Sequence, residues 1–206
     1  MAKNVNKDRP SDFYFKLILL GDYNVGKTSI FRRFKDNEFK ESGNLSVGID
    51  NYSKVIEVDG QNVTLVLWDT VGTERFRTLT RNYFRNADAC LIVFSSNEPE
   101  TLTSLTQWVR DADDFSENAL KALIRNKNDL KCLIAQEKVN AFAHHHDCDI
   151  VFNISAKTGE GIQEMFKTIA QKLILKSSRV QKNQSLFERD VHQLDAHEVD
   201  VKATCC

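Results

Sequence analysis

The sequence has no long apolar run, no excess of charge of either sign, and no apolar core in its first twelve residues. Its longest apolar runs, such as Ala89–Phe94, are strand-sized, whereas a membrane span needs roughly 18–20 apolar residues. The 28 Lys and Arg residues nearly balance the 29 Asp and Glu residues, which excludes the broad basic surface of a non-specific nucleic-acid binder. The N-terminal segment has no apolar core like that of a signal peptide. We therefore expect a protein that is made and kept on the cytosolic side and has no nucleic-acid partner.

The 206 residues suit one domain with a tail. The hydrophobic pattern dissolves into polar sequence near Ser177, which is typical of a flexible segment. We expect a short N-terminal extension over residues 1–11, a globular domain over 12–176 and a flexible tail over 177–206.

Cysteine is sparse within the expected domain. Cys90, Cys132 and Cys148 are scattered, so we expect reduced thiols rather than disulfides. The remaining two of the five cysteines, Cys205 and Cys206, are the last residues of the chain. Their position calls for a separate explanation.

Strand-like and helix-like patterns alternate along the chain. Strands are expected over Phe13–Leu20, Asn51–Val58, Asn62–Trp68, Ala87–Ser95, Ala119–Ile124 and Ile150–Ser155. Helices are expected from Gly26 to about Asp36, over Pro99–Phe115 and Gln136–His146, and in a long final segment that begins near Ile162. Asp59-Gly60-Gln61 is a hairpin signal. The alternation predicts an α/β fold with a mostly parallel sheet of about six strands and one antiparallel edge hairpin.

A phosphate loop follows the first expected strand. The residues from Gly21 to Thr28 fit the pattern G-x-x-x-x-G-K-[ST] and precede an expected helix. Glycines let successive backbone N–H groups turn toward phosphate oxygens, Lys27 adds a positive charge, and the Thr28 hydroxyl is a ligand for Mg²⁺. The expected nucleotide contacts in this loop are Gly21, Asn24, Val25, Gly26, Lys27, Thr28 and Ser29.

A second motif, Asp69-Thr-Val-Gly72, ends the strand that leads to Trp68. An aspartate at the carboxyl end of a strand, facing a phosphate loop, can hold Mg²⁺ through water. The backbone N–H of Gly72 can approach a γ-phosphate. The motif alone is weak, because an acidic turn is common, but its place in the chain fits a P-loop hydrolase.

The third motif selects the base. Asn126-Lys127-Asn128-Asp129 acts with Ser155-Ala156-Lys157. The Asp129 carboxylate can accept two hydrogen bonds from N1–H and the exocyclic amine of guanine, donors that adenine lacks. Lys127 can lie over the base, and the Ala156 N–H can donate to the guanine oxygen. The three motifs in this order predict GTP or GDP as the ligand.

With these motifs the chain resembles the Ras-like small GTPases, and among them the Rab branch, from about Asp12 to Lys176. The resemblance rests on GDYNVGKTS, SVGID, WDTVGTERFRTLTRNYF, NKNDL, SAKTGEGI and the terminal Cys-Cys. It implies a P-loop small G-domain with helices on both faces of the sheet. It also implies a monomeric switch in vesicle-mediated transport that is ordered by GTP and released by GDP.

The resemblance assigns further residues around the nucleotide. Phe39 corresponds to the aromatic that stacks on guanine, and Ser46 to the threonine that ligates Mg²⁺ and meets the γ-phosphate. Thr73 stands where the family usually has the water-orienting glutamine, and Val71 replaces the usual alanine. Because a threonine hydroxyl is too short to reach the attacking water, we expect very slow intrinsic hydrolysis of GTP. Lys27 is the other residue that we expect to act in catalysis. Activating proteins of the TBC type can supply an arginine and a glutamine in trans.

The resemblance also implies partners. These are effectors, an exchange factor, a GTPase-activating protein, a GDP-dissociation inhibitor and a prenylation escort protein. The effector-facing residues are Val47, Gly48, Ile49, Asn51, Trp68 and Tyr83. Asn51 departs from the family, which usually has an aromatic residue there, and this alters the expected effector surface.

The terminal Cys205 and Cys206 correspond to the pair that accepts two geranylgeranyl groups in Rab proteins. One lipid chain binds membranes marginally, whereas two bind firmly. Basic and acidic residues in the tail nearly balance, so no polybasic patch assists. We expect residence on the cytosolic face of endomembranes, with a soluble cytosolic pool.

Several other residues favour structural interpretations. At most two of the four residues His144, His145, His146 and Cys148 could converge on one metal, because consecutive helical residues point about 100° apart, so we expect a solvated helix end. Trp108 is expected in the core, and Glu98-Pro-Glu100 to match a helix dipole. Arg125 has no evident role.

Two other functions remain open from the sequence. Thr73 also fits a constitutively GTP-bound interaction module in which hydrolysis is irrelevant. A P-loop nucleotide kinase is disfavoured by the NKND motif and the terminal cysteines.

Overall fold

The computed structural model describes residues 11–41, 49–70 and 83–179. The strands are β1 (Phe13–Leu20), β2 (Asp50–Val58), β3 (Gln61–Asp69), β4 (Ala89–Ser95), β5 (Leu120–Asn126) and β6 (Ile150–Asn153). The helices are α1 (Lys27–Asp36), α3 (Glu100–Thr103), α4 (Leu105–Phe115), α5 (Gln136–His145) and a C-terminal helix over 162–179. That last helix runs three residues past the expected domain boundary at 176.

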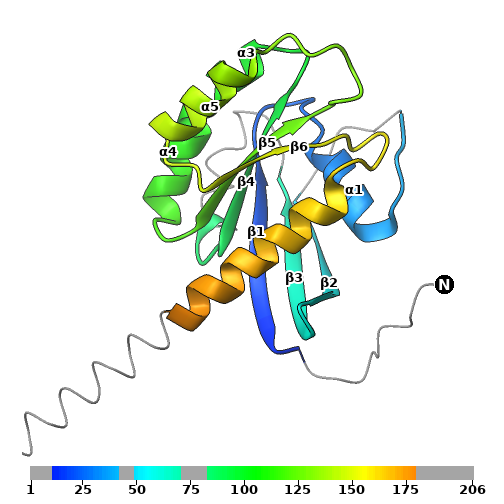
Figure 1. Ribbon diagram of the computed structural model, residues 1–206, viewed down its shortest axis with the longest axis vertical. Coiled ribbons are helices and arrows are strands. Elements are labelled where there is room, and N and C mark those ends of the chain that lie inside the picture. Colours follow the sequence, from blue (N-terminus) through cyan, green and yellow to red (C-terminus); the bar gives the residue numbers. More distant parts are fainter. Residues whose placement is uncertain (1–10, 42–48, 71–82, 180–206) are drawn as a thin grey trace, which may run out of the picture.

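The strands form one six-stranded sheet in the order β2-β3-β1-β4-β5-β6. Only β2 and β3 pair antiparallel; the other neighbours are parallel. The predicted α/β class with one antiparallel edge hairpin is therefore confirmed. β1 lies between β3 and β4, and the strands that follow it along the chain are added first on one side (β2 and β3) and then on the other (β4 to β6). The strand order therefore reverses direction at β1, which creates a switch point at its carboxyl end (Figure 1). Ligands of open α/β sheets bind at such a point.

Helices cover both faces of the sheet, as the family resemblance implied. One core joins Leu17 and Leu19 of β1 to α1 and the C-terminal helix, while a second joins Ile18 and Leu20 to α3, α4 and α5. Because alternate side chains of a strand point to opposite faces, the part of β1 that lies between two helical layers must be apolar at every position. This explains the apolar run Leu17–Leu20 at the end of the first strand (Figure 1).

The hairpin loop and the helix expected over Pro99–Phe115 both differ from the expectations. The hairpin loop contains only Asp59 and Gly60, because both have positive φ (50° and 82°), as a two-residue type I′ turn requires, and Gln61 already belongs to β3. The expected helix from Pro99 to Phe115 is divided at Ser104 into α3 and α4. Hydrogen bonding there tightens to three-residue spacing, as in Gln107 N–H to Ser104 C=O at 3.4 Å.

β5 extends two residues beyond the expected end at Ile124. Arg125 and Asn126 remain in the sheet because they pair with Phe94 and Ser95 of β4. Arg125 is buried, and its Nη2 donates to the Ile134 carbonyl at 3.3 Å. Its Nε has no hydrogen-bond partner among the described residues, and nothing in the structure explains the choice of arginine.

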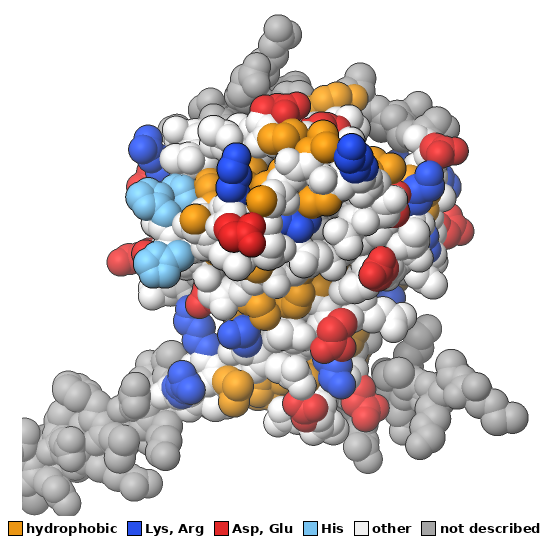
Figure 2. All heavy atoms as spheres, turned by 45° about the horizontal axis from the view of Figure 1, so that its top comes forward, with side chains coloured by type: hydrophobic (Ala, Val, Ile, Leu, Met, Phe, Trp, Pro, Cys, Tyr) orange, Lys and Arg blue, Asp and Glu red, His pale blue; other side chains and the backbone are white. Residues whose placement is uncertain are grey.

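The surface features that were set aside have ordinary structural roles. His144 and His145 lie in the last turn of α5, and His146 caps it. No cluster of three or more potential metal ligands occurs in the described ranges. In Figure 2, which turns the carboxyl edge of the sheet forward, charged side chains of both signs alternate with apolar ones. None of the helices described is long and apolar enough for a membrane span.

Candidate functional site

The phosphate loop connects β1 to α1 and needs glycine at both of its motif positions. Gly21 has φ of 134°, and a Cβ there would lie 2.2 Å from the Val93 carbonyl oxygen of β4. Gly26 has φ of 97°, and its Cβ would lie 2.3 Å from the Asn126 amide nitrogen. Neither position can accept a side chain, so the motif glycines are dictated by close approach as well as by backbone conformation.

Lys27 is held inside the loop that it follows. Its ammonium donates to the carbonyls of Gly21 (2.8 Å) and Asp22 (2.7 Å), and the side chain is buried. Burial lowers the pKa of Lys27 to about 8, against the opposing effects of Asp69 and Asp22. A buried cation encircled by backbone groups at a helix N-terminus is suited to bind an anion.

Asp69 ends β3 beside the same loop. The carboxylate is only 3 % exposed, and its Oδ1 has no hydrogen-bond partner among the residues described. Burial raises the pKa of Asp69 to about 6, although a hydrogen bond from Thr28 and the charge of Lys27 act in the other direction. A buried, unsatisfied carboxylate oxygen next to a hydroxyl fits the oxygen ligands that Mg²⁺ prefers. Thr28 and Asp69, predicted separately from two motifs, are therefore brought together.

Asn126 connects the phosphate loop to the candidate base-binding loops. Its Nδ2 donates to the Val25 carbonyl at 2.9 Å, and its Oδ1 accepts the Ala156 N–H at 3.0 Å. The side chain is 1 % exposed, so both amide groups are satisfied by protein. The N–H that was expected to donate to guanine is thus used to fix the Ser155–Lys157 loop. The direct contact of Ala156 with a base stays a prediction.

Ser155 orients the carboxylate that was predicted to select the base. Its hydroxyl donates to Asp129 Oδ1 at 2.5 Å and accepts the Thr158 N–H at 3.1 Å. Ser155 is fully buried, whereas Asp129 is exposed. The hydrogen bond from Ser155 therefore fixes Asp129 Oδ1, while the residue stays exposed to solvent. A carboxylate held in this way is suited to accept hydrogen bonds from a ligand.

Asp22 anchors the phosphate loop to α4, a contact that the motif analysis missed. The Trp108 indole N–H donates to Asp22 Oδ1 at 2.8 Å, and the Ser104 hydroxyl donates to Oδ2. Trp108 is in the core as expected, being 1 % exposed, but it also holds the loop. A buried indole N–H needs an acceptor, and an acidic residue in an anion-binding loop needs a hydrogen-bond donor. These two requirements could have predicted the contact between Trp108 and Asp22 from the sequence.

Arg33 of α1 was also missed. Its Nε donates to the Ala156 carbonyl (2.8 Å), and its Nη2 and Nη1 donate to those of Lys157 and Asn37 (2.6 Å each). One guanidinium thus joins the end of α1 to the loop behind the base site. The planar, five-donor guanidinium is the side chain that can reach three carbonyls at once.

We expect Arg33→Leu to lower the free energy of unfolding by about 1–2 kcal/mol, because three carbonyls, that of Ala156 partly buried, lose a charged donor. Urea unfolding of the GDP-loaded protein measures this. Arg110→Leu, on the exposed side of α4, is the matched control and should stay within about 0.5 kcal/mol of the wild type. Equal losses in the two variants would contradict a specific role for Arg33.

The predicted effector-facing residues meet in part. Asn51 of β2 is paired with Trp68 of β3, and the Trp68 and Tyr83 rings are 5.4 Å apart. Ile49 directly precedes β2. Phe39, which was predicted to stack on guanine, is half-buried in the segment that follows α1. Asn51 is exposed, and Trp68 opposite it contacts Tyr83. The polar residue therefore lies next to Trp68, whose ring connects it to Tyr83.

Several predicted residues lie outside the described ranges. They are Ser46, Val47, Gly48, Val71, Gly72, Thr73, Cys205 and Cys206.

Fold and loops together define a phosphate-loop nucleotide-binding protein of the α/β class. A family model described as the Ras family matches residues 16–175, and the chain belongs to that family. Ras-related protein Rab-19 of Mus musculus is 36 % identical over 174 residues, covering 83 % of this chain and 80 % of that protein. GTP-binding protein YPTM2 of Zea mays is 33 % identical over 199 residues, covering 95 % and 97 % of the two chains. The protein is a Rab-type small GTPase, as its motifs predicted.

Proposed function

We propose that this protein is a GTP-controlled switch with slow intrinsic hydrolysis that recruits effectors at a membrane during vesicle-mediated transport. The observation that carries the nucleotide assignment is the buried Asn126, which ties the phosphate loop at Val25 to the base-side loop at Ala156. Because these two hydrogen bonds hold the loops at a fixed separation, one ligand could contact both loops in a single rigid site. A nucleotide has a phosphate and a base at the corresponding ends.

The phosphate end is built to hold the outer phosphates. The loop N–H groups and the α1 N-terminus supply positive potential, and Lys27 is already inside the loop with its ammonium desolvated. Exchanging two carbonyl partners for phosphate oxygens would let Lys27 stabilise charge during phosphoryl transfer.

The metal end is assigned to Thr28 and Asp69, with Ser46 as a further ligand. Bound Mg²⁺ would neutralise charge on the β- and γ-phosphates. The unsatisfied buried oxygen of Asp69 supports this assignment because a buried polar atom needs a partner. The Thr28 hydroxyl, hydrogen-bonded to Asp69, is held in the same place.

The base end rests on Asp129. With Oδ1 fixed by Ser155, the carboxylate is oriented to accept the two donors on the Watson–Crick edge of guanine. Adenine would leave that acceptor unpaired, which supports selection of guanine over adenine.

Hydrolysis should be limited by Thr73, which lacks the amide needed to orient the attacking water. Thr73→Gln should raise the single-turnover rate of GTP hydrolysis about tenfold or more, which corresponds to about 1.4 kcal/mol of barrier. Val71→Ala with Thr73→Gln should be faster still, because the branched side chain next to the phosphate is removed. GTP affinity should be unchanged in both variants.

Two results would contradict this explanation. A wild-type rate already equal to that of Thr73→Gln would mean that another residue positions the water. A large loss of GTP binding on restoring the glutamine would mean that the loop is built differently. If neither variant nor an added activator of the TBC type yields hydrolysis, the chain is the constitutively GTP-bound interaction module that the threonine also allows.

The remaining parts of the proposal concern partners. In the GTP state, the loops containing Ser46 and Gly72 would be ordered, and effectors would contact them together with Asn51, Trp68 and Tyr83. Exchange factor, activator, GDP-dissociation inhibitor and escort protein would act on the same monomer. Cys205 and Cys206 would carry the lipids that hold it on endomembranes.

A further inference from the structure

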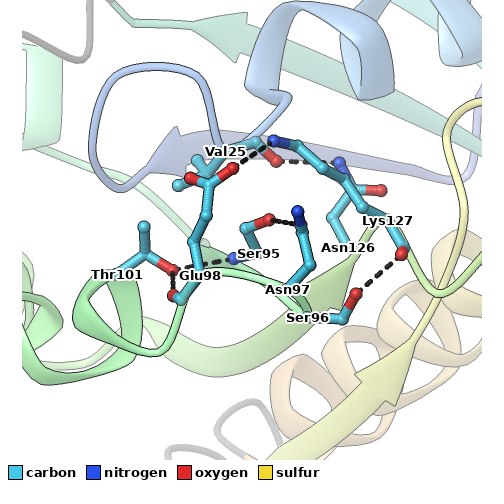
Figure 3. A network of polar contacts seen from close by, with 8 residues as sticks. All are labelled: Val25, Ser95, Ser96, Asn97, Glu98, Thr101, Asn126 and Lys127. Atoms are coloured by element: carbon cyan, nitrogen blue, oxygen red, sulfur yellow. Dashed lines mark hydrogen bonds and ion pairs between the residues drawn. The ribbon is translucent and has the colours of Figure 1, made fainter. Parts of the chain in front are cut away.

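The loop between β4 and α3 contacts both the backbone and the side chain of Lys127. The Ser96 hydroxyl donates to the Lys127 carbonyl at 2.6 Å, and Lys127 Nζ forms an ion pair with Glu98 Oε1 at 3.1 Å (Figure 3). Lys127 has φ of 62°, a backbone conformation that L-residues adopt only when the surroundings enforce it. The lysine of the base-side motif is therefore placed by a segment that belongs to none of the nucleotide motifs.

Glu98 is itself fixed by buried groups. Its carbonyl accepts the Thr101 N–H at 3.0 Å and the Thr101 hydroxyl at 2.6 Å. That hydroxyl in turn accepts the Ser95 N–H at 3.0 Å, and Thr101 is 6 % exposed. Figure 3 shows this chain of contacts leading from β4 to the backbone carbonyl of Glu98, while its carboxylate faces Lys127. Glu98 was expected only to match a helix dipole, but its side chain points to Lys127 instead.

The ion pair is partly shielded from water. The side chains of Lys127 and Glu98 are 22 % and 28 % exposed, so solvent screens them less than a typical surface pair. Holding a lysine in one rotamer costs conformational entropy, and here a protein carboxylate offsets that cost. Preorganised groups strengthen binding because the ligand need not order them.

We propose that Glu98 is a positioning residue for nucleotide retention, acting through Lys127. The ion pair fixes the ammonium so that the aliphatic part of the lysine forms a firm wall of the base site. This inference rests on the proposed guanine-nucleotide site. Its consequence is that a residue outside the nucleotide motifs sets how slowly the protein releases its nucleotide.

Glu98→Gln tests the proposal because it keeps the shape of the side chain and removes its charge. The dissociation rate of a fluorescent GDP analogue, measured with excess unlabelled GDP and Mg²⁺, should rise about two- to fivefold, the upper part of the range for ion pairs near a protein surface. Glu98→Asp, which keeps the charge but is one methylene shorter, should have a dissociation rate between those of the wild type and Glu98→Gln. The matched control is Glu100→Gln, an exposed carboxylate in the first turn of α3, which should release the analogue at the wild-type rate.

A double-mutant cycle distinguishes positioning from general stabilisation. In a Lys127→Ala background, Glu98→Gln should have no further effect on release, since its action passes through the lysine. Faster release of the same size in both backgrounds would overturn the proposal in favour of a structural role. A Glu98→Gln rate equal to or below the wild type would overturn it as well.

The same cycle separates this inference from the proposed function. If Lys127→Ala speeds release but Glu98→Gln does not, the nucleotide site stands and the role of Glu98 is wrong. If Lys127→Ala releases the analogue at the wild-type rate, the assignment of Lys127 to the base site fails, and the role of Glu98 fails with it.

Discussion

Asp129→Asn should lower the affinity for GTP and GDP by about 100-fold or more, which corresponds to about 2.7 kcal/mol. The substitution exchanges a carboxylate oxygen for an amide N–H₂, so a donor faces the donors of guanine. Ser155 still fixes one side of the residue, and the amide cannot turn away without breaking the 2.5 Å hydrogen bond. Xanthine presents a carbonyl where guanine has its amine, and the variant should therefore bind XTP better than the wild type does.

Competition against a fluorescent GDP analogue measures both affinities. Asp114→Asn, an exposed residue of α4, makes the same chemical change away from the site and should leave them unchanged. An Asp129→Asn protein with wild-type GTP affinity would show that the base-selecting residue has been assigned wrongly.

Replacing both Cys205 and Cys206 with serine should move the protein from membranes to the soluble fraction in cells. Under the proposed lipidation, two lipid chains would account for firm anchoring, and the tail offers no substitute, because its basic residues are outnumbered by acidic ones. Fractionation at low and high salt measures the membrane-bound share. In the wild type that share should be insensitive to salt.

Cys132→Ser is the matched control, since Cys132 is an exposed free cysteine within the domain. It should fractionate like the wild type. Membrane association that persists after loss of both terminal cysteines would contradict the lipid anchor.

The strands were largely predictable because burial on two faces leaves a signal in the sequence. The largely apolar sequence of β1 matches its observed bounds, Phe13–Leu20, since Leu17–Leu20 pack alternately into the two helical layers. The end of β5 could not be predicted in this way. Arg125 and Asn126 are polar, and only their pairing with β4 keeps them in the strand.

The site was predictable where one short segment carries the chemistry. The motifs named Lys27, Thr28 and Asp69, and the structure places Thr28 and Asp69 in contact and Lys27 close to them. Contacts between distant segments left no such pattern.

Glu98 and Arg33 show why. Each acts on a nucleotide motif from a different element, 29 residues from Lys127 and 123 residues from Ala156 respectively. Either residue taken alone in the sequence is an ordinary charged side chain on or near a helix, so only the fold reveals what it touches.

The nucleotide carried by the purified full-length protein tests the central claim most directly. The protein is purified in Mg²⁺, denatured, and its released nucleotide is identified and quantified by chromatography. We predict close to one guanine nucleotide per chain, with a substantial share as GTP, because the slow hydrolysis proposed for Thr73 would preserve it. Stoichiometric adenine nucleotide, or no nucleotide and no binding of added GTP, would contradict the account.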